Sequence, residues 1–199
     1  MGETPIASFG ALMADEWGDA EYEAFGALLG LPGEQVPRAG SGHRFDPLNF
    51  SVVGHMVRNT ALARSFFRFN SYLLQRSPLD ARLREMAILR VALRRRAAYE
   101  WGQHVKSARA NGMTDAELGA LISGNDGFTG ADRLVLEATD ALLENGKLDP
   151  STWAALLDEV GVESGMDLIF VVGTYAMLAM AFDTWGLVPE PGSEPLPAT

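Results

Sequence analysis

The sequence predicts an all-α fold. Apolar residues recur at helical spacing almost everywhere after Asn49, whereas the alternating apolar and polar pattern of strands is nearly absent. The chain has 199 residues, 47% of them hydrophobic, which is enough to bury a core in one domain with an extension. We expect a helix-and-loop extension over residues 1–47, a helical domain over residues 48–188 and a disordered tail over residues 189–199.

Glycine, proline and asparagine signals divide the chain into predicted helices. In the extension, a helix over about residues 15–29 is followed by a loop rich in glycine and proline. Thr114 and, three residues later, Glu117 form a capping-box pattern that marks the start of a short helix. From about residue 80 to residue 110 the pattern fits either one helix or two. The remaining helices are predicted over about residues 48–75, 115–123, 131–144, 151–160 and 163–184.

The overall charge excludes several classes of partner. The chain has 26 acidic and 16 basic residues and a formal net charge of −10, which repels nucleic acid and anionic membrane surfaces. A DNA-binding regulator is disfavoured because the N-terminal helix is acidic and no basic recognition helix is present. The absence of cysteine excludes disulfides and thiolate catalysis and fits the cytoplasm. Residues 1–11 lack the pattern of a secretory signal, so we expect no export.

The longest apolar run covers residues 168–182 and is flanked by Asp167 and Asp183. It is shorter than the roughly 18 to 20 residues that span a bilayer, so we expect a buried helix and no membrane contact. The helix predicted over residues 163–184 is apolar on nearly every side. Either it is the central core helix or a second subunit covers part of it, and the second reading favours a homo-oligomer.

Glu100 and His104 are the residues to which the sequence assigns acid–base chemistry. They are four residues apart, so on a helix they share one face and come within hydrogen-bonding reach. A neighbouring carboxylate orients a histidine ring and stabilises its charged form, which equips the pair as a general acid or base. Glutamate–histidine pairs at this spacing also decorate ordinary helix surfaces, so the pair alone leaves both readings open.

Two segments in the middle of the chain form a distinctive pattern. They are Asp-Ala-Arg-Leu-Arg-Glu-Met-Ala-Ile-Leu-Arg-Val-Ala at residues 80–92 and Ala-Tyr-Glu-Trp-Gly-Gln-His-Val at residues 98–105. Together they closely resemble the carboxymuconolactone decarboxylase family. The resemblance is clear over residues 49–123 and weaker as far as Phe182. It implies an all-helical domain of the alkylhydroperoxidase D-like (AhpD-like) superfamily, whose members assemble with the active site close to a subunit contact. We therefore expect a dimer, trimer or hexamer.

Peroxidase members of this superfamily carry a Cys-x-x-Cys-x-x-x-His motif and a glutamate on the preceding helix. By this resemblance the glutamate matches Glu85 and the histidine matches His104, while the cysteine positions fall on Ala97 and Glu100. Neither alanine nor glutamate forms a sulfenate or disulfide, so thiol peroxidase activity is excluded. The resemblance implies a catalytic set of His104, Glu100 and Glu85, in which two neighbouring carboxylates raise the pKa of one of them.

Six arginines between residues 82 and 96 form a basic segment in this acidic chain. They are either solvated and paired with acidic residues, or they create a local positive field that holds a substrate carboxylate. We assign the second role to Arg90, because it shares the general side of the helix on which Glu85 lies. Tyr99 and Trp101 are the other residues expected to bind substrate.

The remaining histidines are His43 and His55. Their imidazole nitrogens, together with the carboxylate oxygens of Asp46 and Glu100, are ligand types that suit divalent metals. Their spacing matches no metal-binding pattern, and we expect neither a metal nor a cofactor.

The sequence leads to two hypotheses of function. The first is a decarboxylase, isomerase or lactone-opening enzyme that acts on a small carboxylated molecule by cysteine-free acid–base chemistry, as the resemblance implies. The second is a non-catalytic member of the same fold that binds a ligand or serves as a scaffold. Convergence of Glu85, Glu100 and His104 on one site would favour the first hypothesis.

Overall fold

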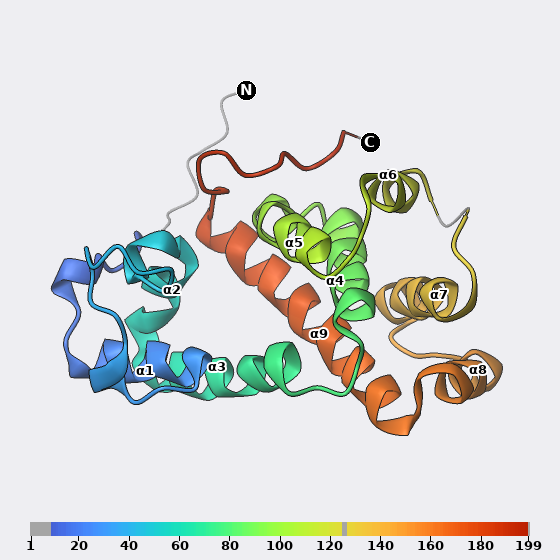
Figure 1. The fold of residues 1–199 in the computed structure, drawn as a ribbon, viewed down its shortest axis with the longest axis horizontal. Helices are drawn as coiled ribbons and strands as arrows, with labels where there is room; N and C mark the ends of the chain where they lie inside the picture. The colour runs from blue at the N-terminus through green and yellow to red at the C-terminus, as the bar shows by residue number, and fades with distance from the viewer. Residues whose placement is uncertain (1–8, 125–126, 199) are drawn as a thin grey trace. The chain divides into compact units, whose positions relative to one another are not determined.

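The structure is a computed structural model that describes residues 9–124 and 127–198 (Figure 1). It confirms the predicted all-α class, since the described residues form helices, turns and loops and no strand. The contacts divide the chain into two units. The first unit runs up to Arg76 and includes Thr184–Leu187, and the second consists of Ser77–Asp183 and the chain from Val188 onward.

Among its described residues, the first unit has three α-helices and four short 3-10 helices, and Trp185 packs against its core. Phe25 of the first α-helix and Val53 of the second are almost fully buried there. Because the third helix packs along the first, the contacts divide the chain at Arg76, whereas the sequence predicts a division at residue 47. The elements are η1 (Ala14–Glu16), α1 (Asp19–Leu29), η2 (Gly33–Gln35), η3 (Pro47–Asn49), α2 (Ser51–Met56), η4 (Val57–Asn59) and α3 (Thr60–Gln75).

The single helix predicted over residues 48–75 is interrupted in the structure. Asn59 leaves the helical conformation, with φ −124° and ψ 87°, and its side chain accepts a hydrogen bond from the backbone N–H of Leu62 at 3.1 Å. Asparagine is a strong N-cap residue because it satisfies a backbone donor that a helix start leaves unpaired. The cap therefore ends the preceding turn and begins α3.

In the part of the chain that the structure describes, the second unit contains helices α4 to α8, most of α9 and a C-terminal segment without helix (Figure 1). Thr114 caps α6 as predicted, and Glu117 bonds back to the N–H of Thr114 to complete the capping box. The helices are α4 (Ala81–Arg95), α5 (Ala98–Ala110), α6 (Asp115–Ser123), α7 (Gly130–Asn145), α8 (Pro150–Val160) and α9 (Val162–Trp185).

A sharp turn separates α4 from α5, so the region from residue 80 to residue 110 forms two helices. Arg96 adopts the left-handed conformation with φ 58°, and the N–H of Ala97 bonds to the carbonyl oxygen of Ala92 at 2.9 Å. This geometry is a common way to end a helix, although glycine usually occupies the left-handed position. The chain then turns back, and α5 packs against α4.

The core of the second unit lies where α4, α5 and α7 meet. Met86 and Leu89 of α4, Trp101 and Val105 of α5, and Leu136 of α7 are at most 1% exposed. Burying an aromatic or large aliphatic side chain contributes on the order of 2 kcal/mol to folding. This cluster therefore holds α4 and α5 in a fixed relation to each other.

An ion-pair network joins α4 to α7. Arg90 donates to both carboxylate oxygens of Asp140, at 2.8 and 2.6 Å, and Arg94 donates to the same two oxygens at 2.8 and 2.7 Å. Burial alone would raise the pKa of Asp140, but the hydrogen bonds from the two arginines outweigh it and lower the pKa. The carboxylate is thus charged at neutral pH and neutralises a buried guanidinium.

Helix α9 has one buried side and one exposed apolar side. Leu168, Val171 and Tyr175 are buried, whereas Met166 and Met177 are about half exposed. By length and composition α9 could cross a membrane, but 56% of its most apolar window is buried inside the protein, as in the core helix of a soluble protein. The exposed side is consistent with the predicted subunit contact, which stays a prediction.

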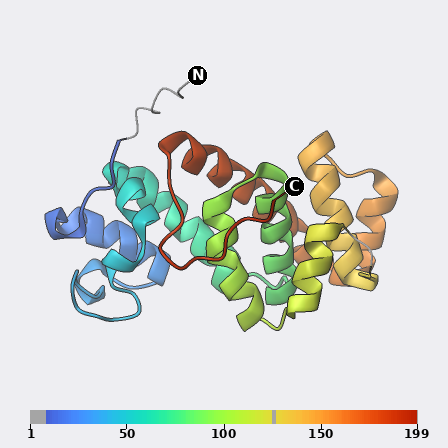
Figure 2. The ribbon, with the colours of Figure 1, turned by 90° about the horizontal axis from the view of Figure 1, so that it is seen from above.

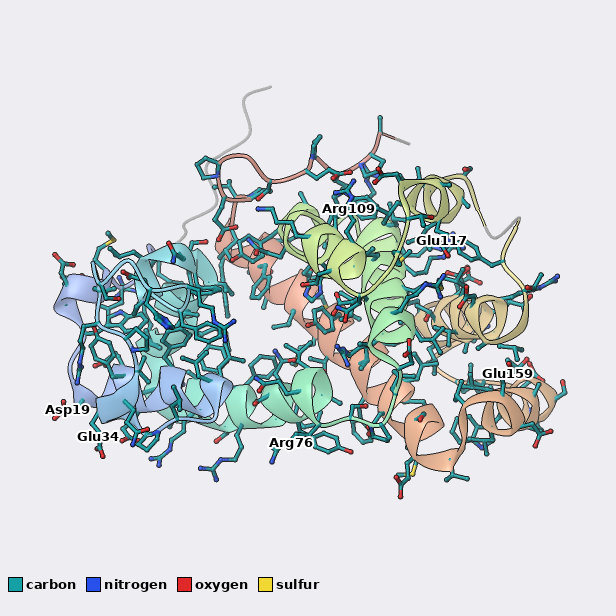
Figure 3. The ribbon with its side chains drawn as sticks, in the orientation of Figure 1. Asp19, Glu34, Arg76, Arg109, Glu117 and Glu159 are labelled. Carbon is teal, nitrogen blue, oxygen red and sulfur yellow. The ribbon has the colours of Figure 1, made fainter. Side chains whose placement is uncertain are left out.

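The C-terminal segment, residues 188–198, follows a defined course across α5, although its composition predicts disorder (Figure 2). Glu190 accepts hydrogen bonds from Tyr99 and Gln103. Arg109, labelled in Figure 3, pairs with Glu194. A Cβ atom at Gly102 would lie 2.9 Å from Cβ of Ser193, so glycine permits this close approach. These polar contacts hold a segment that has too few apolar residues to order itself.

The Asp140 network gives a first prediction. Replacing Asp140 with Asn leaves the buried guanidinium of Arg90 without an anion and should lower the free energy of unfolding by about 3 kcal/mol. Replacing Arg94, whose side chain is 45% exposed, with Ala should cost less than about 1 kcal/mol. Urea unfolding at pH 7 measures both changes. Equal losses in the two variants would show that burial of Arg90 does not set the cost.

Candidate functional site

The turn between α4 and α5 brings Glu85 and His104 together. Nδ1 of His104 lies 2.7 Å from Oε2 of Glu85, and the two side chains are 15% and 3% exposed. A carboxylate only accepts hydrogen bonds, so Nδ1 carries the proton and the ring orientation is fixed. The sequence could not show this contact, because the residues come from different helices.

Tyr175 of α9 forms a third wall around this pair. Its ring meets the ring of His104 edge to face, with centroids 4.9 Å apart and planes at 88°. Burial, followed by the negative charges of Glu85 and Glu100, raises the pKa of Tyr175 well above its ordinary value. The hydroxyl therefore stays protonated and remains a hydrogen-bond donor at physiological pH. Tyr175 was not among the predicted site residues.

Glu100 is a buried carboxyl group without a hydrogen-bond partner among the described residues. It is 3% exposed, and neither Oε1 nor Oε2 has a partner. Burial and, second, the negative charge of Asp183 raise the pKa of Glu100 to about 8. Glu100 is therefore largely protonated at neutral pH.

This geometry corrects the predicted hydrogen bond between Glu100 and His104, since the histidine pairs with Glu85 instead. The sequence predicted that one of the two carboxyl groups has a raised pKa. Glu100 has a raised pKa, but the main cause is burial and not the neighbouring carboxylate of Glu85. Glu85 and Glu100 still lie in one electrostatic site, because each of them, when ionised, raises the pKa of Tyr175.

Arg84 is a site residue that the sequence reasoning placed among the solvated or paired arginines. It is 7% exposed, its Nε atom has no hydrogen-bond partner among the described residues, and a terminal nitrogen lies 3.8 Å from Oε1 of Glu85. Its positive charge also reaches Tyr175 and lowers the pKa there. A buried guanidinium with an unused donor is well suited to an anion. Its position directly before Glu85 was the only available signal in the sequence.

The contacts of Arg90, Tyr99 and Trp101 do not support the predicted substrate-binding roles. Arg90 is engaged by Asp140 and the carbonyl oxygen of Leu121. Trp101 is 1% exposed and belongs to the core cluster, and the hydroxyl of Tyr99 donates to Glu190 at 2.8 Å.

Within the described residues, no group of three or more histidine, aspartate or glutamate side chains is placed to hold a metal ion. His43 and Asp46, considered as ligands from sequence, lie in the loop before α2, where Asp46 instead accepts backbone hydrogen bonds from Gly42 and Leu48.

Comparison with protein families finds a similarity for part of the second helical unit and the end of the first. The sequence profile of the carboxymuconolactone decarboxylase family matches residues 60–144. Over these residues the chain is similar to that family. The match confirms the resemblance and covers Arg84, Glu85, Glu100 and His104, but it ends before Tyr175. A search of curated proteins finds no match.

The raised pKa of Glu100 predicts how stability depends on pH. Folded Glu100 keeps its proton up to a pH of about 8, whereas an unfolded glutamate releases it near 4.5. Between these values the folded state binds more protons, so the free energy of unfolding falls as pH rises. Glu100→Gln removes the titrating group and therefore this loss. Between pH 5 and pH 9, the free energy of unfolding of the unaltered protein should fall by roughly 3 to 5 kcal/mol more than that of the variant.

Denaturant unfolding at the two pH values measures this difference. Glu159→Gln, at an exposed glutamate of α8 labelled in Figure 3, is the matched control and should show no such trend. A parallel pH response of the Glu100→Gln variant and the unaltered protein would mean that Glu100 ionises normally.

Proposed function

We propose that this carboxymuconolactone decarboxylase-like domain is an enzyme that moves protons on a small carboxylated molecule. The reaction class is decarboxylation, isomerisation or lactone opening. The observation that carries the proposal is the buried Glu85–His104 hydrogen bond, in a site that also holds the protonated Glu100. The similarity of residues 60–144 to the carboxymuconolactone decarboxylase family supports this function only at the level of the family.

His104 is the proposed base. Glu85 accepts a hydrogen bond from Nδ1–H, so in the neutral imidazole Nε2 carries the lone pair that can remove a proton from a carbon next to a carbonyl group. The carboxylate of Glu85 also stabilises the imidazolium that forms in this step. Glu85 is therefore a positioning residue, because it acts through His104.

Glu100 is the proposed acid, since its raised pKa keeps a proton available near neutral pH. In an isomerisation, His104 takes a proton from one carbon, the double bond shifts, and Glu100 returns a proton at another carbon. In a decarboxylation, the bond to the carboxylate carbon breaks, carbon dioxide leaves with no electron pair, and Glu100 protonates the carbon that keeps the pair. Both steps balance without an oxidant or reductant.

Arg84 and Tyr175 supply the proposed contacts to negative charge. The unused Nε donor of Arg84 suits a substrate carboxylate, and the protonated hydroxyl of Tyr175 suits a carbonyl oxygen that becomes an enolate. The near closure of the site excludes water and strengthens each of these interactions.

The same closure supports a second candidate function, a non-catalytic ligand-binding domain. The side chain of His104 is 15% exposed and that of Arg84 is 9% exposed, and Glu85, Glu100 and Tyr175 are buried. A site that does not open for substrate would bind a ligand without turnover.

We also propose that the protein works in the cytoplasm as a homo-oligomer. The absence of cysteine supports the proposed cytoplasmic location. The half-exposed apolar side of α9, with Met166, Ile169 and Met177, supports the proposed homo-oligomer.

Turnover of lactone carboxylates tests the enzyme proposal. A panel that includes carboxymuconolactone should show carbon dioxide release or a double-bond shift by NMR, and His104→Ala should lower kcat by about 100-fold or more. His43→Ala, at a histidine in the loop before α2, is the matched control and should retain full activity. Full activity of the His104→Ala variant would exclude the proposed base, and binding without turnover would favour the ligand-binding alternative.

Arg84 gives a separate prediction. Arg84→Met removes the charge but keeps an apolar stem, so KM for a carboxylated substrate should rise roughly tenfold or more. For the corresponding methyl ester, which lacks the charge, KM should change little. Steady-state kinetics on both substrates separates this role from a general loss of folding, which would lower kcat for both.

A further inference from the structure

The first unit contains an aromatic cavity that uses none of the candidate site residues. Its volume is about 300 Å³, and it lies where the segment at Phe9 meets α2, the start of α3 and the end of α9. The residues that matter to its chemistry are Phe9, His55, Met56, Arg58, Leu62 and Trp185.

Three rings form one wall of this cavity. The centroids of Phe9 and His55 are 5.9 Å apart, those of Phe9 and Trp185 are 5.5 Å apart, and the rings of His55 and Trp185 are parallel within 4° at 6.4 Å. Met56 and Leu62 add further apolar surface. Flat aromatic faces beside a cavity of this size suit a planar ring system.

The wall is held in place by backbone contacts. Nδ1 of His55 lies 3.0 Å from the carbonyl oxygen of Ser51, so it carries the proton and the ring cannot turn without losing a hydrogen bond. The N–H of Leu12 bonds to the carbonyl oxygen of Gly54 at 2.9 Å, which fixes the segment next to Phe9. The cavity is therefore formed before a ligand arrives.

Arg58 gives the cavity its charge. Its Nε atom donates to the carbonyl oxygen of Gly10 at 2.6 Å, which orients the guanidinium. Among the described residues Arg58 forms no ion pair, and no acidic side chain lines the cavity. Its terminal nitrogens are thus available for an anion.

The combination of charge and rings selects the ligand. The faces of aromatic rings attract organic cations, but Arg58 lines this cavity with a positive charge that repels them, and no acidic residue is among the described lining residues. An anion on a flat apolar body satisfies both parts of the cavity. We infer that this cavity is a binding site for a small aromatic carboxylate, and the inference does not depend on the proposed catalysis.

Binding of naphthalene-2-carboxylate to the full chain tests the inference. We expect saturable binding below about 1 mM in calorimetry, with roughly tenfold or more weaker binding to Arg58→Gln. Arg64→Gln removes the same charge from an arginine of α3 that does not line the cavity, and it should bind as the unaltered protein does. Naphthalene-2-methanol, which has the same rings without the charge, should bind both Arg58→Gln and the unaltered protein weakly and equally.

Two further variants place the ligand. Leu62→Trp fills the cavity without changing charge and should abolish binding even if Arg58→Gln misfolds. Arg84→Met should leave binding unchanged, which separates this cavity from the proposed catalytic site. The inference is overturned if the carboxylate fails to bind, if it binds Arg58→Gln or Leu62→Trp as well as the unaltered protein, or if Arg84→Met alone removes binding.

Discussion

The candidate site depends on the turn at Arg96. If α4 and α5 continued as one straight helix, the 19 residues from Glu85 to His104 would separate them by about 28 Å. The side chains instead meet at 2.7 Å, because the chain turns back within two residues. Arg96 takes a left-handed conformation that costs about 1 kcal/mol for a residue other than glycine. Its guanidinium donates to the carbonyl oxygen of Pro197, a contact that helps to offset this cost.

Burial then gives the two glutamates different chemistry. Both are 3% exposed, but Glu85 faces the imidazole of His104 whereas Glu100 has no hydrogen-bond partner among the described residues. A buried carboxylate is costly unless it is paired, and an unpaired carboxyl group avoids the cost by keeping its proton. One turn of the chain therefore places in one site a carboxyl group that pairs with His104 and a second carboxyl group that keeps its proton at neutral pH.

Local signals in the sequence predicted the helices well, because caps such as Thr114 with Glu117 act within a few residues. The break at Arg96 could not be predicted, since the left-handed residue is not glycine. Helical periodicity also shows on which side of a helix an arginine lies, but it does not show which other helix packs against that side. Arg90 was preferred for that reason, yet its side meets Asp140, 50 positions further along the chain, and Arg84 is the one beside Glu85.

The start of α5 shows why a glutamate at position 100 favours proton chemistry. A helix N-terminus stabilises a negative charge by up to about 1 kcal/mol, and it lowers the pKa of a thiol placed there. The rise in the pKa of Glu100 from 4.5 to about 8 corresponds to roughly 5 kcal/mol in the opposite direction, so burial outweighs the helix. In the peroxidases that this domain resembles, the same position holds a redox cysteine. A buried carboxyl group there retains a proton that it can donate, and it has no oxidation state to exchange.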